Sequence, residues 1–259
     1  MELFGRIVVG VDGTEWGLEA LRQALTLAPE NESTVEAVTA LDTAPAVWTG
    51  FEASYWVGLL EKEAQEARDQ ATATLSGRTG SARVVGGRPV PVLREARDAL
   101  DATLLALGGR HSSRLLGIVL GDTVTELLHD GVCSVFVARP PERGPWQPRK
   151  IVVGVDGSPS SLAGLACADD IAMRLEGRVE AVAAGEAAMI EGDGEWPRRV
   201  ERHAGAEPVA TLTERSREAD LVVVGSRSLH GVRALGSVSE RVAHGSSCSV
   251  LVVHAPDVP

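Results

Sequence analysis

The sequence predicts an α/β protein made of two tandem open parallel-sheet domains, with the second copy shortened. One block recurs: RIVVGVDGT at residues 6–14 returns as KIVVGVDGS at residues 150–158, an offset of 144 residues. Later blocks that begin at Thr103 and Cys133 return with offsets of 117 and 115 residues. In both copies apolar strands alternate with amphipathic helices, which is the pattern of a parallel sheet covered by helices. The chain is therefore interpreted as a duplication.

In copy one, the β-branched run at residues 7–11 predicts a buried strand, and leucines on one face predict a helix over residues 14–28. Charges of both signs at residues 61–68 indicate a solvated helix face. Further strands are predicted at residues 35–41, 83–85, 103–107 and 134–138, and further helices at residues 57–75, 92–100 and 123–130.

Copy two repeats this order with less chain. The drop of the offset from 144 to 117 corresponds to a loss of 27 residues (144 − 117) after the opening strand. Residues 185–205 are rich in glycine, so we predict a loop with a frayed strand there and no second helix. Strands are predicted at residues 151–155, 179–183, 221–224 and 249–253, and helices at residues 160–175, 209–217 and 237–244.

A proline-rich linker separates the copies. Residues 139–149 contain four prolines, which cannot continue a helix or an interior strand. We therefore predict one domain over residues 1–140 and another over residues 148–259.

Charge and cysteine content exclude several classes of function. A net charge of −11 argues against nucleic acid and anionic membranes as partners, since both require a basic face. Neither a signal-peptide pattern at the start nor a run of about 18 apolar residues occurs, which predicts a cytoplasmic location. Because Cys133, Cys167 and Cys248 lack metal-ligand spacing, they are predicted to be reduced core residues, with Cys133 and Cys248 as buried strand residues. No metal site is predicted.

Each copy carries an aspartate at the end of its opening strand, Asp12 and Asp156, followed by glycine and by Thr14 or Ser158. The first interpretation is a turn with a helix N-cap. The second is a carboxylate that accepts hydrogen bonds from a bound adenosine, because the carboxyl ends of parallel strands form the ligand crevice. Both interpretations stay open.

A glycine-rich loop follows the fourth strand of each copy, GGRHSSRLLGIVLGDT from Gly108 and GSRSLHGVRALGSVSE from Gly225. Its glycines permit close backbone approach, and its last residues open a helix whose free N–H groups attract phosphate. With the aspartate-ending strand before it, this loop resembles the ATP-binding members of the universal stress protein family. Their pattern is a glycine, two residues, a glycine, nine residues, and a glycine followed by serine or threonine. The resemblance covers nearly the whole chain twice.

The resemblance implies a fold of the adenine-nucleotide α-hydrolase-like type, a regulatory role in stress response, and ATP as the ligand. The sequence has neither G-x-S-x-G nor G-x-x-x-x-G-K-[ST], and no general base is expected at the glycine-rich loop, so the protein is not expected to be an enzyme. The positions that correspond to the ligand-binding pattern, and so are candidate binding residues, are Asp156, Gly225, Ser228, Gly236 and Ser237 in copy two and Asp12, Gly108 and Gly121 in copy one.

The two copies depart from this pattern differently. In copy one, His111 replaces the second glycine and Asp122 replaces the hydroxyl residue. A carboxylate there would cap the helix itself and repel a phosphate about 4 Å away by roughly 1–4 kcal/mol. In copy two, Ser228 replaces the second glycine and the spacer has seven residues, but Gly236 and Ser237 remain. Copy two is therefore predicted to hold the better, though degraded, ATP site.

Two further features lie in the last helix and the fifth strand of each copy. The equivalent His129 and His244 end the last helix of each copy, where an imidazole stabilises the helix dipole. In the family the fifth strands commonly pair, so the resemblance implies an intrachain pseudo-dimer of the copies and leaves a homodimer open. An unknown protein partner is also implied. The alternative function is a scaffold that interacts with other proteins and binds no nucleotide.

Overall fold

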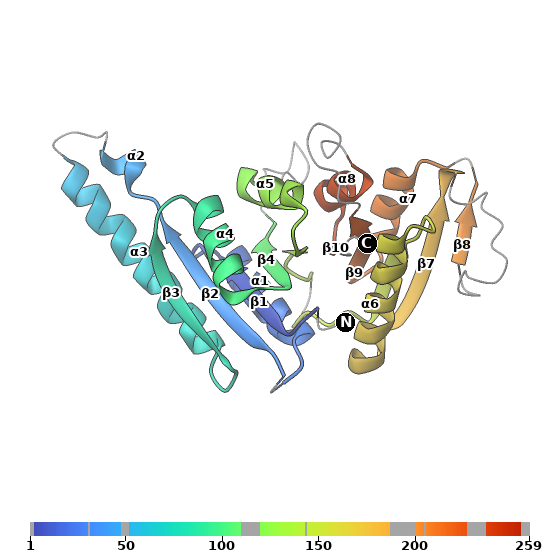
Figure 1. The fold of residues 1–259 in the computed structure, drawn as a ribbon, viewed down its shortest axis with the longest axis horizontal. Helices are drawn as coiled ribbons and strands as arrows, with labels where there is room; N and C mark the ends of the chain where they lie inside the picture. Colours follow the sequence, from blue (N-terminus) through green and yellow to red (C-terminus); the bar gives the residue numbers. More distant parts are fainter. Residues whose placement is uncertain are drawn as a thin grey trace. The chain divides into compact units, whose positions relative to one another are not determined.

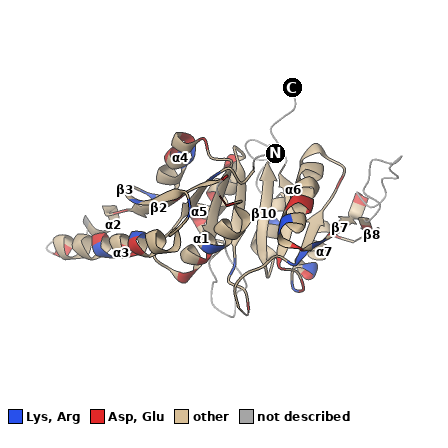
Figure 2. Cartoon of the chain, turned by 90° about the horizontal axis from the view of Figure 1, so that it is seen from below, with Lys and Arg blue, Asp and Glu red and all other residues tan. Residues whose placement is uncertain are grey.

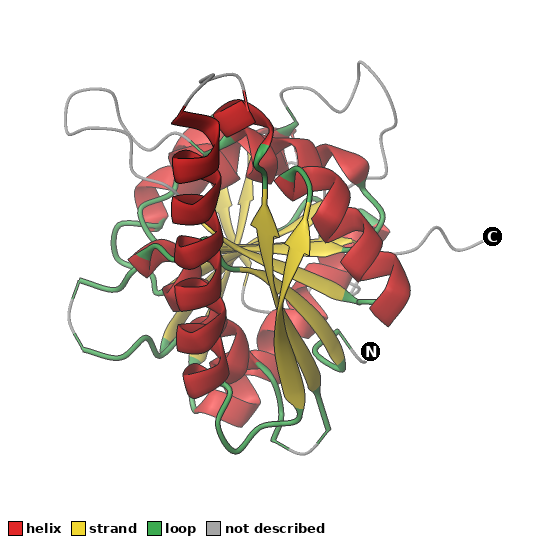
Figure 3. Cartoon of the chain, turned by 90° about the vertical axis from the view of Figure 1, so that its left-hand side faces the viewer, coloured by secondary structure: helices red, strands yellow, loops and turns green. Residues whose placement is uncertain are grey.

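The computed structural model describes residues 3–30, 32–47, 52–109, 120–142, 144–186, 200–204, 206–226 and 237–254. The chain divides into two compact units, an N-terminal unit at Glu2–Gly108 and a C-terminal unit at Gly109–Pro259. In each unit helices surround the strands (Figures 1 and 3).

The N-terminal unit is a parallel sheet of order β3-β2-β1-β4 (Figure 1). Val8 in its centre pairs with Glu36 on one side and Leu105 on the other. Its strands are β1 (Arg6–Gly10), β2 (Thr34–Leu41), β3 (Gly80–Gly86) and β4 (Leu104–Gly108), and its helices are α1 (Glu15–Leu27), α2 (Ala44–Val47), α3 (Ala53–Thr74) and α4 (Pro89–Leu100).

Helix α3 shows how the sequence pattern becomes a packed surface. Only the small residues Ala64, Ala67 and Ala71 are buried along it, and it packs on α1, β2 and β3. Its charged residues lie in the stretch 61–69, where blue and red bands mark the helix in Figure 2, and Lys62 pairs with Glu66. The charged stretch at residues 61–68 therefore lies on a solvated helix, as the sequence predicts.

The C-terminal unit has the strand order β5-β10-β9-β6-β7-β8. All its neighbouring strands are parallel except β5 and β10, which are antiparallel. Its strands are β5 (Ser134–Ala138), β6 (Lys150–Gly154), β7 (Arg178–Ala184), β8 (Val200–His203), β9 (Leu221–Ser226) and β10 (Ser249–His254), and its helices are α5 (Asp122–Asp130), α6 (Pro159–Leu175), α7 (Pro208–Arg215) and α8 (Val238–Gly245).

The antiparallel pair of β5 and β10 joins equivalent strands of the two sequence copies. Phe136 pairs with Leu251, and both side chains are fully buried. The flanking bonds are reciprocal, because the N–H of Arg139 donates to Ser249 Oγ (2.9 Å) and that of His254 donates to Ser134 Oγ (3.0 Å). Since β5 packs with copy two, the compact units divide at Gly108 rather than in the linker. The domain limits 1–140 and 148–259 stay a prediction drawn from the sequence repeat.

The two copies follow the same strand order. The order β8-β7-β6-β9 in copy two matches β3-β2-β1-β4 in copy one. Strand β8 lies inside the glycine-rich stretch that predicts a frayed strand, whereas residues 187–199 lie outside the described residues. Helix α2 and the full length of β3 are not predicted by the sequence.

One prediction about the cysteines is wrong. Cys133 and Cys248 are half-buried and stand directly before β5 and β10, rather than within them. The two strands are buried, as expected, but each begins one residue after its cysteine. Cys167 in α6 is buried, as predicted. None of the described helices has both the length and the apolar character that a membrane span requires.

Candidate functional site

Asp156 forms a tight turn at the carboxyl end of β6. Its Oδ1 accepts hydrogen bonds from the N–H (3.0 Å) and Oγ–H (2.5 Å) of Ser158. Ser158 Oγ in turn accepts from the N–H of Ser161 (3.2 Å) and so caps α6. Between Asp156 and Ser158, Gly157 has a φ of +78°, a conformation that favours glycine. The sequence Asp-Gly-Ser therefore specifies a turn and an N-cap at the strand end.

Copy one builds the same turn at the end of β1. Asp12 Oδ1 accepts from the N–H (3.1 Å) and Oγ1–H (2.5 Å) of Thr14, and Thr14 Oγ1 accepts from the N–H of Gly17 (3.3 Å). Asp12 is exposed, whereas Asp156 is half-buried. The turn interpretation thus describes both aspartates. Each carboxylate also lies at the carboxyl end of the sheet, which is where open α/β sheets bind their ligands.

Gly225 at the end of β9 touches the start of α6. A Cβ at Gly225 would lie 2.4 Å from the carbonyl carbon of Ser160, so no other residue fits without a shift of the backbone. The equivalent Gly108 is equally constrained, since its Cβ would lie 2.6 Å from the carbonyl carbon of Trp16. These close approaches bring Gly225 to the start of α6, which follows the Asp156 turn, and Gly108 to the start of α1, which follows the Asp12 turn.

A group of hydroxyls surrounds the turn in copy two. Ser158 Oγ lies 3.2 Å from Ser160 Oγ, and the N–H of Asp156 donates to Ser161 Oγ (3.3 Å). The 144-residue offset places Trp16 and Gly17 at the positions of Ser160 and Ser161. Sequence reasoning missed these two serines, although that offset could have found them.

The helices that follow the glycine-rich loops begin differently. In copy two, Ser237 is the N-cap of α8, and its Oγ accepts from the N–H of Glu240 (3.3 Å). In copy one, the N-cap is Gly121, which has no side chain to cap with, and the exposed Asp122 is the first helical residue. The expectation that Asp122 caps α5 is therefore wrong by one residue. Asp122 is already the first residue of the helix, and Gly121 before it is the N-cap.

Three of the sequence-predicted positions cannot be placed. Ser228, Gly236 and His111 lie outside the described residues. Among the described residues, no group of three or more His, Cys, Asp or Glu side chains is arranged to hold a metal ion.

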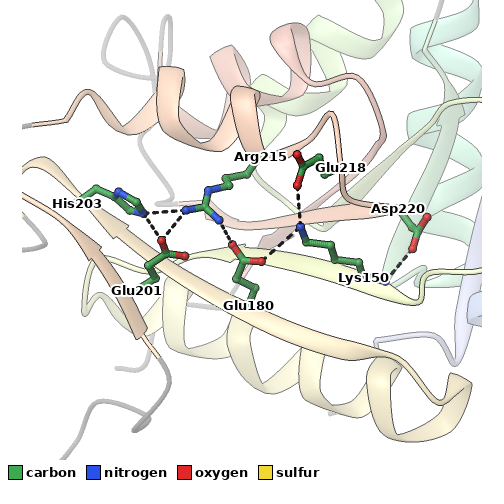
Figure 4. Close-up of polar contacts among 7 residues, drawn as sticks. All are labelled: Lys150, Glu180, Glu201, His203, Arg215, Glu218 and Asp220. Atoms are coloured by element: carbon green, nitrogen blue, oxygen red, sulfur yellow. Dashed lines mark hydrogen bonds and ion pairs between the residues drawn. The ribbon is translucent and has the colours of Figure 1, made fainter.

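A second polar cluster lies in the C-terminal unit (Figure 4) and joins β6, β7 and β8 to α7 and the segment that follows it. Arg215 lies at its centre, with Nη1 2.6 Å from Glu180 and Nη2 2.5 Å from Glu201. Lys150 Nζ lies 3.6 Å from the second oxygen of Glu180. The residues drawn are Lys150, Glu180, Glu201, His203, Arg215, Glu218 and Asp220.

The charges in this cluster compensate one another. Burial alone would raise the pKa of Glu201, but the hydrogen bond and charge of Arg215 outweigh burial and lower it. Burial likewise opposes the charge of Arg215, whose pKa is nevertheless raised by Glu201 and Glu180. Because Glu180 and Glu201 each face a cation, the cluster stabilises the attachment of β8 and α7.

Comparison with known proteins agrees with the fold and the repeat. The model of the universal stress protein family matches residues 3–139 and 176–254. A universal stress protein of Mycolicibacterium smegmatis is 29% identical, over 95% of this chain and 96% of its own length. One of Mycobacterium tuberculosis strain H37Rv is 28% identical over 95% of each chain. The crystal structure of a universal stress protein from Archaeoglobus fulgidus superimposes with a TM-score of 0.73 at 18% identity, over 98% of this chain and 99% of that one.

Proposed function

The chain belongs to the universal stress protein family, and on that basis we propose that it is a stress-response regulatory protein whose second copy binds an adenine nucleotide. The family implies the stress-response role. The nucleotide, its location in copy two and the regulatory consequence are the proposal.

The convergence of Asp156, Gly225 and the serine hydroxyls in copy two carries this proposal. Asp156 offers a half-buried carboxylate that can accept hydrogen bonds from the ribose or the adenine amino group. This carboxylate binds Ser158 Oγ, which lies 3.2 Å from Ser160 Oγ, and Gly225 packs on the backbone of Ser160. A ligand in the crevice at the carboxyl ends of β6 and β9 would meet these groups together.

The start of α8 supplies the second part of the proposal. Ser237 caps this helix with a neutral hydroxyl, so the positive end of the helix dipole has no carboxylate in the capping position. Helix starts of this kind favour phosphate groups. The proposal therefore places the phosphates toward Ser237 and the nucleoside toward Asp156.

Copy one is proposed to bind the nucleotide weakly or not at all. Trp16 and Gly17 replace two of the hydroxyl residues, and Asp122 places a negative charge at the first residue of α5, whereas the first-turn acid of α8, Glu240, stands two residues further into its helix. At short range this charge opposes a phosphate by an amount on the order of 1 kcal/mol in water and more where water is excluded. One nucleotide per chain is the expected stoichiometry.

Native mass spectrometry of the full chain tests this proposal. The protein as purified, and then after incubation with ATP and Mg²⁺, should show a mass increase of one nucleotide per chain. No added mass in either sample would contradict nucleotide binding and favour a scaffold that acts without it. Two nucleotides per chain would contradict the assignment to copy two alone.

A further inference from the structure

Helices α5 and α8 contact each other through two equivalent histidines. His129 Nε2 of α5 lies 3.1 Å from Glu240 Oε2 of α8, and His244 Nε2 of α8 lies 3.3 Å from Thr125 Oγ1 of α5. The offset of 115 residues relates both His129 to His244 and Thr125 to Glu240. The two contacts are therefore reciprocal, like the bonds that flank the β5–β10 pair.

The two contacts nevertheless differ in chemistry. His129 faces a carboxylate at the distance of an ion pair, although not with the geometry of a hydrogen bond. His244 instead faces a neutral hydroxyl on Thr125 and a backbone N–H, that of Leu120, which lies 3.4 Å from its Nδ1.

The contact with Leu120 fixes the proton on His244. A backbone N–H can only donate, so Nδ1 must accept and carries no proton. The single proton of the neutral ring then lies on Nε2 and donates to Thr125 Oγ1. With these two bonds, the neutral ring holds Leu120, which directly precedes the N-cap Gly121, and Thr125 in the first turn of α5.

We propose that His244 is a positioning residue that holds the start of α5 when its ring is neutral and releases Leu120 when the ring takes up a proton from solvent. The added proton resides on Nδ1, where it faces the N–H of Leu120, so two donors oppose each other and the bond is lost. The Nε2 bond to Thr125 remains. A residue of copy two thereby controls the helix start of copy one, whether or not a nucleotide binds.

The surroundings of His244 favour the neutral ring. Burial contributes most to lowering its pKa, and the positive charges of Arg139 and His129 add to this effect, while Glu240 on its own helix opposes it. The ordinary pKa of histidine is about 6.5. The Leu120 bond is therefore present above that pH and lost as the pH falls through the lowered pKa of folded His244.

Amide NMR spectroscopy of the ¹⁵N-labelled full chain between pH 8 and pH 5 tests the proposal. The Leu120 amide resonance should move with the same midpoint as the His244 ring resonances, below pH 6.5. Hydrogen exchange of that amide, corrected for its intrinsic pH dependence, should become at least about tenfold less protected below the midpoint. The wild-type chain alone can overturn the proposal. It does so if the Leu120 amide resonance does not move, or moves with a midpoint different from that of the His244 ring.

Two variants sharpen the experiment. In His244→Gln, the side-chain carbonyl can accept from Leu120 but does not titrate, so the transition at Leu120 should disappear. In the matched His129→Gln, the equivalent histidine is removed from the other helix, and the transition at Leu120 should persist. An unchanged Leu120 transition in a folded His244→Gln protein would contradict the proposal.

Discussion

Gly225 lies against the carbonyl of Ser160 so closely that a Cβ at this glycine would be 2.4 Å from the carbonyl carbon. The contact fixes the end of β9 against the first turn of α6, and Gly108 and Trp16 repeat it in copy one. Packing of a strand end on a helix start thus sets the geometry of the candidate site, and the requirement for glycine there is structural before it is functional.

Gly225→Ala is therefore expected to destabilise the protein by roughly 1–3 kcal/mol, because the added methyl group must displace backbone. Gly58→Ala is the control, since Gly58 lies in α3 with open space around its Cβ position. That change should stabilise the protein by about 0.5–1 kcal/mol through helix propensity. Urea unfolding measures both variants, and equal free energies of unfolding would contradict the close contact.

The reciprocal serine bonds of the β5–β10 pair predict matched effects. Ser134→Ala removes the acceptor for the His254 N–H, and Ser249→Ala removes the acceptor for the Arg139 N–H. Each loss of a partner for a buried donor should cost about 1–2 kcal/mol of unfolding free energy. Ser247→Ala, at an exposed position just before β10, should have little effect. Because Ser249 Oγ also donates to the Arg139 carbonyl (3.3 Å), Ser249→Ala should be the costlier change. The absence of a measurable cost for either serine would contradict the reciprocal arrangement.

Arg215 is predicted to control the titration of Glu201. Its hydrogen bond and charge outweigh burial and lower the pKa of Glu201, so this pair stabilises the fold above the ordinary glutamate pKa of about 4.3. That contribution is lost as the pH falls through the lowered pKa of the folded state. In Arg215→Gln, NMR titration of the Glu201 side chain should show a higher pKa. Lys62→Gln, which removes an exposed helix pair, should leave Glu201 unchanged.

The thiols of Cys167 and Cys248 are predicted to react slowly. Burial raises the pKa of each to about 12. At pH 8 about one thiol in ten thousand is then ionised, and only the thiolate is nucleophilic. Iodoacetamide labelling followed by mass spectrometry should show slow modification at both sites, with a rate that rises with pH. Rapid labelling of Cys248 at pH 8 in the folded protein would contradict the effect of burial on this half-exposed residue.

The fold could be predicted from the sequence to a large extent because its determinants are local. Apolar runs such as that of β1 and the recurring Asp-Gly-Thr/Ser turns specify strand ends and helix starts through nearby residues. The four-residue helix α2 is too short to give a periodic pattern. The sequence does not show that Cys133 and Cys248 stand just outside their strands, because full burial begins only where β5 and β10 pair with their neighbours.

The site was predicted less completely for a physical reason. Asp12, Asp156, Gly108 and Gly225 lie at strand ends, where residue type alone indicates a special role. The contacts of His129 and His244 depend instead on the antiparallel pairing of strands from different copies, which no local pattern specifies. An interaction with the dipole of its own helix predicts no partner for either histidine on the other helix, although Glu240 contacts His129 and Thr125 contacts His244.

The binding of one nucleotide at copy two is tested most directly by isothermal titration of ATP with Mg²⁺ into Asp156→Asn and Asp12→Asn. Asparagine keeps an oxygen for the turn in both variants, so each fold is retained while the negative charge is lost. Asp156→Asn should weaken binding by roughly 10- to 100-fold, which corresponds to about 1.5–3 kcal/mol for a hydrogen bond to a charged group. Asp12→Asn should leave affinity and a stoichiometry of one unchanged. Equal losses in the two variants, or a loss in Asp12→Asn alone, would contradict the account.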